Sequence, residues 1–180
     1  MVAGAASVLA RMERMSIAAD THAHPTAPEI ATASRDDLGD VLRVQHSGFL
    51  RVARMFHIPP DRLSALTEGL EDLQSMMDGG YAFLLSRADG RVVGTVRAEL
   101  RHDGVVEVGR LAVDDGYERR GIATALMLSI EDVWPQARRV ELFTGAQATV
   151  PLSLYAKLGY ELFDKPGEVR EGLVWLAKQR

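Results

Sequence analysis

The sequence predicts one α/β (α+β) domain, in which helices cover both faces of a mixed central sheet of about six to seven strands. The chain has 180 residues, which suits a single compact domain. Along it, the apolar pattern changes between helical spacing and strand-like alternation, and glycine or proline marks most of these changes. The expected order of elements is β-α-α-β-β-β-α-β-α-β-β, which implies helices on both faces.

Residues 1–28 are expected to form a flexible extension ahead of a domain at residues 29–180. The extension is rich in small residues, Thr, His and Pro, and no apolar period runs through it. His22 and His24 are close enough to chelate a metal, but no second ligand pair accompanies them. A solvated tail is the simpler interpretation, and no metal site is predicted.

The first half of the domain is expected to be a short strand followed by two helices. Ser34, with Asp37 three residues later, is typical of a helix N-terminus. Pro59 and Pro60 interrupt the helical spacing, and Gly79–Gly80 ends the second helix. The predicted elements are a strand at 29–34, a helix up to Phe56 and a second helix from Asp61 to Met77.

From Tyr81 onward, the apolar residues alternate, which predicts strands. Turn sequences at residues 88–90 and 102–104 separate three of these strands, which should form an antiparallel meander. The helix that follows should connect the third strand to a parallel neighbour by a right-handed crossover. The predicted elements are strands at 81–86, 91–100 and 105–113, a helix at 121–133, a strand at 139–144, a helix at 151–158 and strands at 160–164 and 172–178.

The composition excludes several classes of function. A formal net charge of −4 argues against general nucleic-acid binding. The chain has no cysteine, which excludes disulfides, thiolate metal sites and a cysteine nucleophile. No stretch approaches the ~20 apolar residues of a membrane span, and Met1–Ala10 lacks the charged region of a signal peptide. We therefore expect a cytoplasmic protein without nucleic-acid or membrane partners.

A strand, a sharp loop and a helix that begins at a glycine follow one another within residues 107–126. The first turn of a helix has unpaired N–H groups and the positive end of the helix dipole, which together bind anions. Gly121 and Ala123 permit close approach of a phosphate, and Arg119 and Arg120 add positive charge. A pyrophosphate fits this chemistry, although a capped turn with two solvated arginines explains the loop alone equally well. The P-loop and dinucleotide-binding motifs are both absent from the sequence.

This loop resembles the signature of the GNAT superfamily of N-acetyltransferases, Arg/Gln-x-x-Gly-x-Gly/Ala after a strand ending in a Leu-Ala-Val-like triplet. Residues 118–123 occupy the signature, with Glu118 at the position of Arg or Gln. That departure is expected to weaken the positive field of the loop. Residues 154–160, Leu-Tyr-Ala-Lys-Leu-Gly-Tyr, are similar to the family's Leu-Tyr-x-Lys-x-Gly-Phe element, although Ala148 and Pro151 replace the Asn and Ala that often precede it. The resemblance covers roughly residues 32–180.

The resemblance implies that acetyl-coenzyme A is the co-substrate and enters a gap between the strands at 105–113 and 139–144. Backbone amides of Leu111 and Val113 would hold its pantetheine arm and acetyl carbonyl, and its pyrophosphate would lie on Arg119–Thr124. The predicted binding residues are Leu111, Ala112, Val113, Glu118, Arg119, Arg120, Gly121, Ile122, Ala123 and Thr124.

Transfer to an amine requires a proton acceptor, because alkyl amines have pKa values of ~10 and only the neutral amine attacks a thioester. Glu107 is the candidate base, because strand alternation places it on the same face as Leu111 and Val113. Some members of the family carry a catalytic Glu at the matching position, while a surface glutamate is the competing interpretation. The rival bases are Glu99, His102 and Asp103.

Tyr155 is the candidate acid. The resemblance implies that it donates a proton to the departing coenzyme A thiolate, and its spacing to Gly159 fits the family element. A packed helix aromatic with its hydroxyl at the surface is the alternative. Since the chain has no cysteine, direct transfer in a ternary complex is the simplest scheme.

The sequence therefore predicts an N-acetyltransferase acting on a primary amine of a small molecule or a protein. A catalytically silent CoA-binding module and an acyltransferase for a longer acyl-CoA are the alternatives. Positive charge near the first two helices, where this family selects its acceptor, favours an acidic acceptor, although a solvated helix face explains it as well. These charges come from Arg51, Arg54, His57 and Arg62. Members of the family often dimerise, and the sequence leaves a homodimer open.

Overall fold

The computed structural model describes residues 28–168 and 171–180, so the predicted extension lies outside the described residues except for Pro28. The strands are β1 (Glu29–Thr32), β2 (Ala82–Ala88), β3 (Arg91–Leu100), β4 (Val105–Val113), β5 (Arg139–Gly145), β6 (Glu161–Phe163) and β7 (Leu173–Gln179). The helices are α2 (Leu38–Met55), α3 (Ser64–Thr67), α4 (Leu70–Asp78), α5 (Ile122–Glu131) and α6 (Thr149–Lys157).

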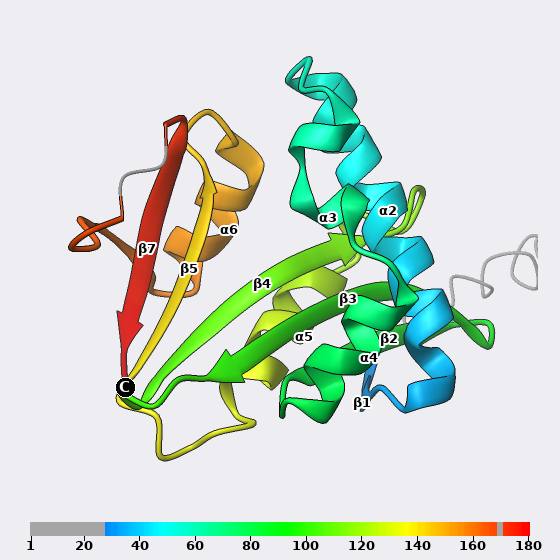
Figure 1. Ribbon diagram of the computed structural model, residues 1–180, viewed down its shortest axis with the longest axis horizontal. Coiled ribbons are helices and arrows are strands. Elements are labelled where there is room, and N and C mark those ends of the chain that lie inside the picture. Colours follow the sequence, from blue (N-terminus) through cyan, green and yellow to red (C-terminus); the bar gives the residue numbers. More distant parts are fainter. Residues whose placement is uncertain (1–27, 169–170) are drawn as a thin grey trace, which may run out of the picture.

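The described strands form one mixed sheet in the order β1-β2-β3-β4-β5-β7-β6. Helices α2, α3 and α4 lie on one face of it, and α5 and α6 lie on the other (Figure 1). This is the fold class and the order of elements that the sequence predicts. None of the described helices combines the length and apolar character that a membrane span requires.

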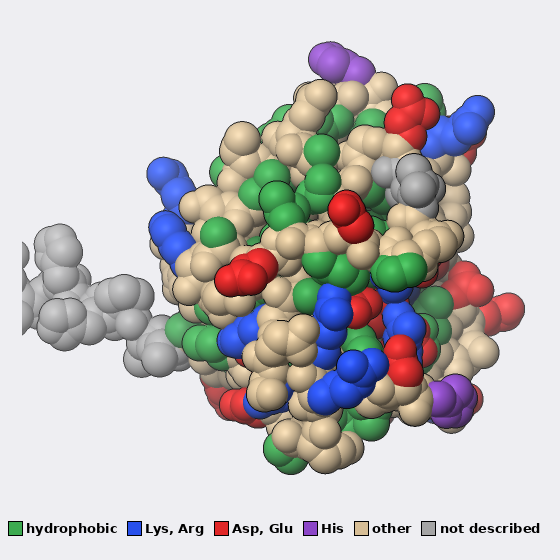
Figure 2. Space-filling model, turned by 90° about the vertical axis from the view of Figure 1, so that its left-hand side faces the viewer, with side chains coloured by type: hydrophobic (Ala, Val, Ile, Leu, Met, Phe, Trp, Pro, Cys, Tyr) green, Lys and Arg blue, Asp and Glu red, His purple; other side chains and the backbone are tan. Residues whose placement is uncertain are grey.

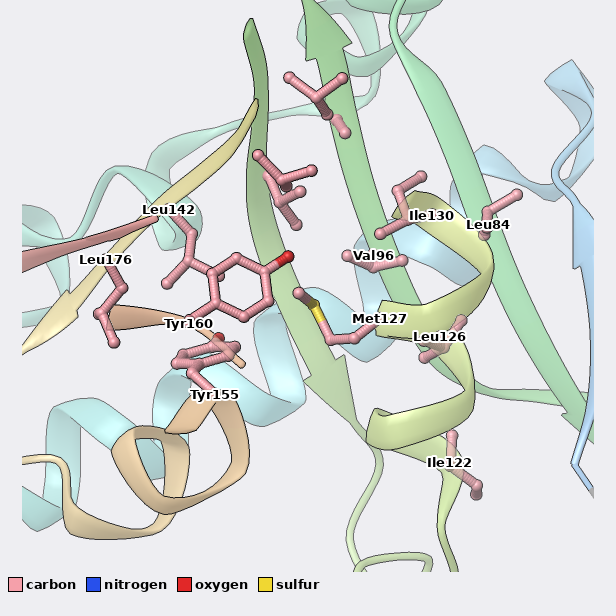
Figure 3. Close-up of a cluster of buried hydrophobic side chains, with 14 of the residues drawn as sticks. Leu84, Val96, Ile122, Leu126, Met127, Ile130, Leu142, Tyr155, Tyr160 and Leu176 are labelled. Carbon is pink, nitrogen blue, oxygen red and sulfur yellow. The ribbon is translucent and has the colours of Figure 1, made fainter. Parts of the chain in front are cut away.

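An apolar core fills each side of the sheet. On the α5 side, Leu126, Met127 and Ile130 are fully buried against side chains of the strands and of α6 (Figure 3). On the other side, α2 and α4 bury Val41 and Leu73 against the sheet. The helical spacing of these apolar residues explains why each helix turns one face to the sheet.

The second predicted helix is not continuous. Its region forms a 3₁₀ turn (Pro60–Arg62), α3 and α4, and the backbone is extended at Leu63 and at Glu68–Gly69. Gly69 precedes α4, and its N–H donates to the Asp72 carboxylate at 2.7 Å. The prediction of one helix from Asp61 is wrong, because the backbone leaves the helical conformation at Leu63 and again at Glu68–Gly69, where Gly69 is the N-cap of a separate helix.

Strands β4 and β5 are parallel neighbours only where they begin. Their register pairs Val105–Glu107 with Arg139–Glu141, after which the two strands diverge (Figure 1). Instead, β5 pairs along its whole length with β7. In the described part of the chain, the edge of β4 beyond Glu107 therefore lacks sheet pairing on the β5 side and is open to another hydrogen-bonding partner.

A bulge in β4 changes the face on which its later side chains lie. Relative to β3, β4 has one extra residue at Arg110, whose φ is 55°. As a result, Leu111 and Val113 pack on the α5 side, whereas Glu107 lines a cleft on the α3 side. The prediction that Glu107 shares a face with Leu111 and Val113 is wrong, because one extra residue reverses the alternation.

Candidate active site

The loop between β4 and α5 has the geometry of an anion site. Gly121 is the N-cap of α5 with a φ of 80°, and a Cβ placed there would meet nothing within 4 Å. Because glycine has no side chain to cap the helix, the first N–H groups, at Ile122, Ala123 and Thr124, stay open to a ligand. Arg119, with a φ of 59°, leads into this turn. The arrangement suits a phosphate close to the backbone.

Glu118, which departs from the GNAT signature, is engaged through both carboxylate oxygens. One accepts the N–H of Gly116 at 2.9 Å, and the other lies 3.0 Å from Nη1 of Arg51. Arg51 belongs to α2, contacts Asp115 and donates to the carbonyl of Val113 at 3.2 Å. From the sequence, Arg51 is expected near the acceptor region. It lies instead against the predicted cofactor loop, where its positive charge offsets the negative charge of Glu118.

The two members of this ion pair should change coenzyme A affinity in opposite directions. Arg51→Gln removes a positive charge beside the predicted phosphate site, so we expect the Kd for coenzyme A to rise about twofold to fivefold at low salt. Glu118→Gln removes the opposing charge and should lower the Kd about twofold. Calorimetric titrations at low ionic strength and in ~0.5 M salt measure both effects, which should shrink in salt. If both variants raised the Kd for coenzyme A, or both lowered it, the proposed opposing roles of Arg51 and Glu118 would be contradicted.

Tyr155 lies in α6 on the α5 side of the sheet, and its side chain is 7% exposed. Its ring meets that of Tyr160 edge-on, with centroids 5.9 Å apart (Figure 3). Among the described residues the Tyr155 hydroxyl has no hydrogen-bond partner, whereas that of Tyr160 donates to Glu131 at 2.8 Å. Burial raises the pKa of Tyr155 to about 12, so its phenol is protonated at neutral pH. Leu111 borders the same core.

Glu107 lies on the opposite face, where β4 and β5 begin to separate. Its carboxylate accepts hydrogen bonds from Arg101 at 3.3 Å and from Lys165 at 3.2 Å. It stands directly opposite Glu99 in the register of β3 and β4. The structure therefore places Glu107 and Tyr155 on opposite sides of the sheet, with the gap between β4 and β5 separating them.

A cleft of about 190 Å³ opens beside Glu107. Of the rival bases, Glu99 lines this cleft, while His102 and Asp103 lie exposed in the turn after β3. Burial is the main cause that raises the pKa of Tyr81 to about 12, and a hydrogen bond with Glu99 adds to it. The lining residues are Ser64, Tyr81, Arg97, Glu99, Glu107, Val108, Gly109, Arg110 and Phe143.

Glu68 joins two arginines at the wall of this cleft. Its carboxylate accepts hydrogen bonds from Arg97 at 2.8 and 3.0 Å and from Arg110 at 2.5 and 3.2 Å. Gln45 donates another at 2.8 Å. Burial disfavours the Glu68 anion, but the bonds from Arg110 and Arg97 outweigh it and lower the pKa to about 2. Sequence reasoning missed this cluster, because its charged members are 29 and 42 residues apart and follow no motif.

A larger hollow, of about 450 Å³, lies by β6 and β7 and includes none of the predicted site residues in its lining. On the described part of the side shown in Figure 2, several Lys and Arg side chains gather over the lower middle of the surface, with Asp and Glu side chains among and around them. Within residues 28–168 and 171–180, no group of three or more His, Asp or Glu side chains is placed to hold a metal ion.

The fold is that of known N-acetyltransferases. The PaiA N-acetyltransferase of Thermoplasma acidophilum, solved with coenzyme A, has a TM-score of 0.73 at 21% identity, covering 86% of this chain and 100% of its own. The ribosomal-protein-alanine N-acetyltransferase of Brucella melitensis has a TM-score of 0.64 at 17% identity, covering 84% and 99%. At these identities the likeness shows the fold alone.

Sequence comparison supplies the family. Residues 51–160, more than half of the chain, match the model of the Acetyltransferase (GNAT) family. The chain belongs to this family. It is also 26% identical over 124 residues to the UPF0157 protein YqkA of Bacillus subtilis (strain 168), covering 68% of this chain and 34% of that protein. The chain thus spans about a third of the length of this curated relative.

Proposed function

We propose that this protein is an N-acetyltransferase that moves the acetyl group of acetyl-CoA directly onto a primary amine. The observation that carries the proposal is the divergence of β4 and β5 beside the open N-terminus of α5. The divergence leaves backbone groups for an extended ligand, and the helix end suits its phosphates. Membership of the GNAT family and the coenzyme A held by the PaiA enzyme support the same ligand.

Acetyl-CoA would lie along the free edge of β4. In this proposal, the N–H groups of Leu111 and Val113 hold the pantetheine arm and the acetyl carbonyl, and the pyrophosphate lies on Arg119–Thr124. Ala112 packs against α2 on the other face of the strand and keeps the strand in place. Glu118, bonded to the loop backbone and to α2, holds the phosphate loop rather than the phosphate.

The acceptor amine would enter the cleft on the α3 side. Glu107, directly or through water, would take one proton from the ammonium, with Glu99 opposite it as the second candidate. The neutral amine then attacks the acetyl carbonyl, a C–N bond forms and the C–S bond breaks. Tyr155, approaching from the other side of the sheet, would give its proton to the thiolate, while the Val113 amide stabilises the oxyanion. The second proton of the attacking nitrogen would leave through water and restore the Tyr155 phenol.

Calorimetry and a thiol-release assay test this function together. We expect saturable binding of acetyl-CoA and coenzyme A, and turnover with members of a broad panel of amines and peptides. Binding without turnover would favour a silent CoA-binding module, and competition between acyl chain lengths would detect preference for a longer acyl-CoA. Glu107→Gln and Glu99→Gln, run on the same panel, identify the base. No binding at millimolar ligand would refute the proposal.

A further inference from the structure

The cleft on the α3 side has a cationic end and an anionic end. Arg97 and Glu99 are two residues apart in β3 and both line it, so their Cα atoms lie about 7 Å apart. On β4, Glu107 stands opposite Glu99, and Arg110 bonds to the same carboxylate as Arg97. Positive charge therefore gathers at one end of the cleft and negative charge at the other.

The cationic end holds more positive charge than its own carboxylate neutralises. Within residues 28–168 and 171–180, Glu68 is the only carboxylate that pairs with Arg97 and Arg110, so two guanidinium groups share one anion. Arg110 also donates to the neutral Ser64 hydroxyl at 2.8 Å and lies over the ring of Phe49, neither of which carries a negative charge. The side chains of Arg97 and Arg110 are only 9% and 15% exposed, which limits screening of this charge by solvent. A further anion entering the cleft would be attracted to this end.

The anionic end offers a place for an ammonium group. Glu107 is paired with Arg101 and Lys165. Glu99, which faces it, interacts with the Tyr81 hydroxyl and pairs with no cation in the part of the chain that the structure describes. A positively charged amine would supply that missing partner and would arrive beside the proposed base.

We propose that the acceptor is a small molecule of amino-acid size that carries a carboxylate as well as its amine. Its carboxylate binds at Arg97 and Arg110, whose planar guanidinium groups suit a carboxylate, and its ammonium group binds at Glu99. The Cα atoms of Arg97 and Glu99 lie only about 7 Å apart along β3, and both residues line the cleft, which suits a compact acceptor that carries both charges. This inference rests on the proposed acetyl transfer and specifies the substrate class of the same site.

The test compares matched acceptors that differ only in the carboxylate. Leucine, leucinamide and 3-methylbutylamine form one set, and β-alanine, its amide and ethylamine form a second set with a longer spacing between amine and carboxylate. Rates of thiol release are taken as kcat/KM per neutral amine, so that differences in amine pKa do not enter the comparison. We expect the carboxylate member of at least one set to exceed its partners tenfold or more. Equal or higher values for the amide and the plain amine would overturn the inference.

Variants connect this preference to the arginines. In Arg110→Gln and Arg97→Gln, the ratio between the carboxylate acceptor and its plain amine should fall at least fivefold, whereas Arg35→Gln, at an exposed position outside the cleft lining, should keep the wild-type ratio. A ratio measured within one variant is insensitive to how much of the protein is folded. An unchanged ratio in both arginine variants would refute the inference while leaving acetyl transfer intact. Intact acetyl-CoA binding with no turnover of any acceptor would instead refute the proposed function, and this inference with it.

Discussion

Tyr155→Phe should lower kcat by a factor of about 10²–10⁴, the usual contribution of a general acid, with the Kd for acetyl-CoA changed less than about twofold. The substitution removes only the hydroxyl, which has no hydrogen-bond partner among the described residues, so packing around the ring should persist. Single-turnover thiol release and calorimetric titration with acetyl-CoA measure the two quantities separately. Wild-type turnover in this variant would remove Tyr155 from the mechanism.

Tyr160→Phe is the matched control, because the two tyrosine rings are in contact and both are buried. The Tyr160 hydroxyl donates to Glu131 at 2.8 Å, so its loss should lower the free energy of unfolding by roughly 1–3 kcal/mol. It should leave kcat nearly unchanged, because the proposed chemistry does not use that hydroxyl. If both variants lose activity equally, the effect of Tyr155→Phe is structural.

Glu68→Gln should lower the free energy of unfolding by roughly 3–5 kcal/mol at neutral pH, since it leaves two buried guanidinium groups without their carboxylate. The Glu68 side chain is 11% exposed, and it is the common partner of Arg97 and Arg110. Urea denaturation followed by tryptophan fluorescence measures the change. Glu71→Gln, at an exposed position on α4, is the control and should change stability by less than about 0.5 kcal/mol.

The stability difference between wild type and Glu68→Gln should depend on pH if it arises from the charge of Glu68. The pKa of Glu68 falls from 4.5 to about 2 on folding, so its stabilisation is complete above about pH 4.5 and is lost as the pH falls towards 2. The depressed pKa corresponds to about 3 kcal/mol. Because glutamine resembles the protonated acid, the gap between wild type and Glu68→Gln should narrow steadily through this window. A gap that stays constant down to the acid limit of folding would mean that the charge of Glu68 contributes nothing.

The fold could be predicted because its signals are local. The strands expected at 91–100 and 105–113 have the bounds of β3 and β4, since alternation and turn residues lie within each segment. Gly121 stands directly before α5 for an equally local reason: the turn there requires a positive φ. The loop and the tyrosine proposed for cofactor binding and catalysis could be selected from the sequence because the family motifs are contiguous.

Features that depend on contacts between distant segments could not be predicted in this way. The extra residue at Arg110 places Leu111 on the opposite face from the one expected, and the residue pattern of β4 does not predict this bulge. Similarly, the cluster that Glu68 forms with Arg97 and Arg110 joins residues from three separate segments. Arg51, expected near the acceptor, lies against the loop between β4 and α5 because α2 packs across β4.

The sequence alone determined the order of the elements, the family and the position of the helix end that suits a pyrophosphate. Each of these features depends on residues that are close together in the sequence. Only the tertiary structure decided which side chains face the cleft proposed for the acceptor. That choice depends on where β4 leaves β5, on the bulge in β4 and on which charges from separate segments meet in a buried place. Such ion pairs form only when folding brings the segments together and excludes water from between them.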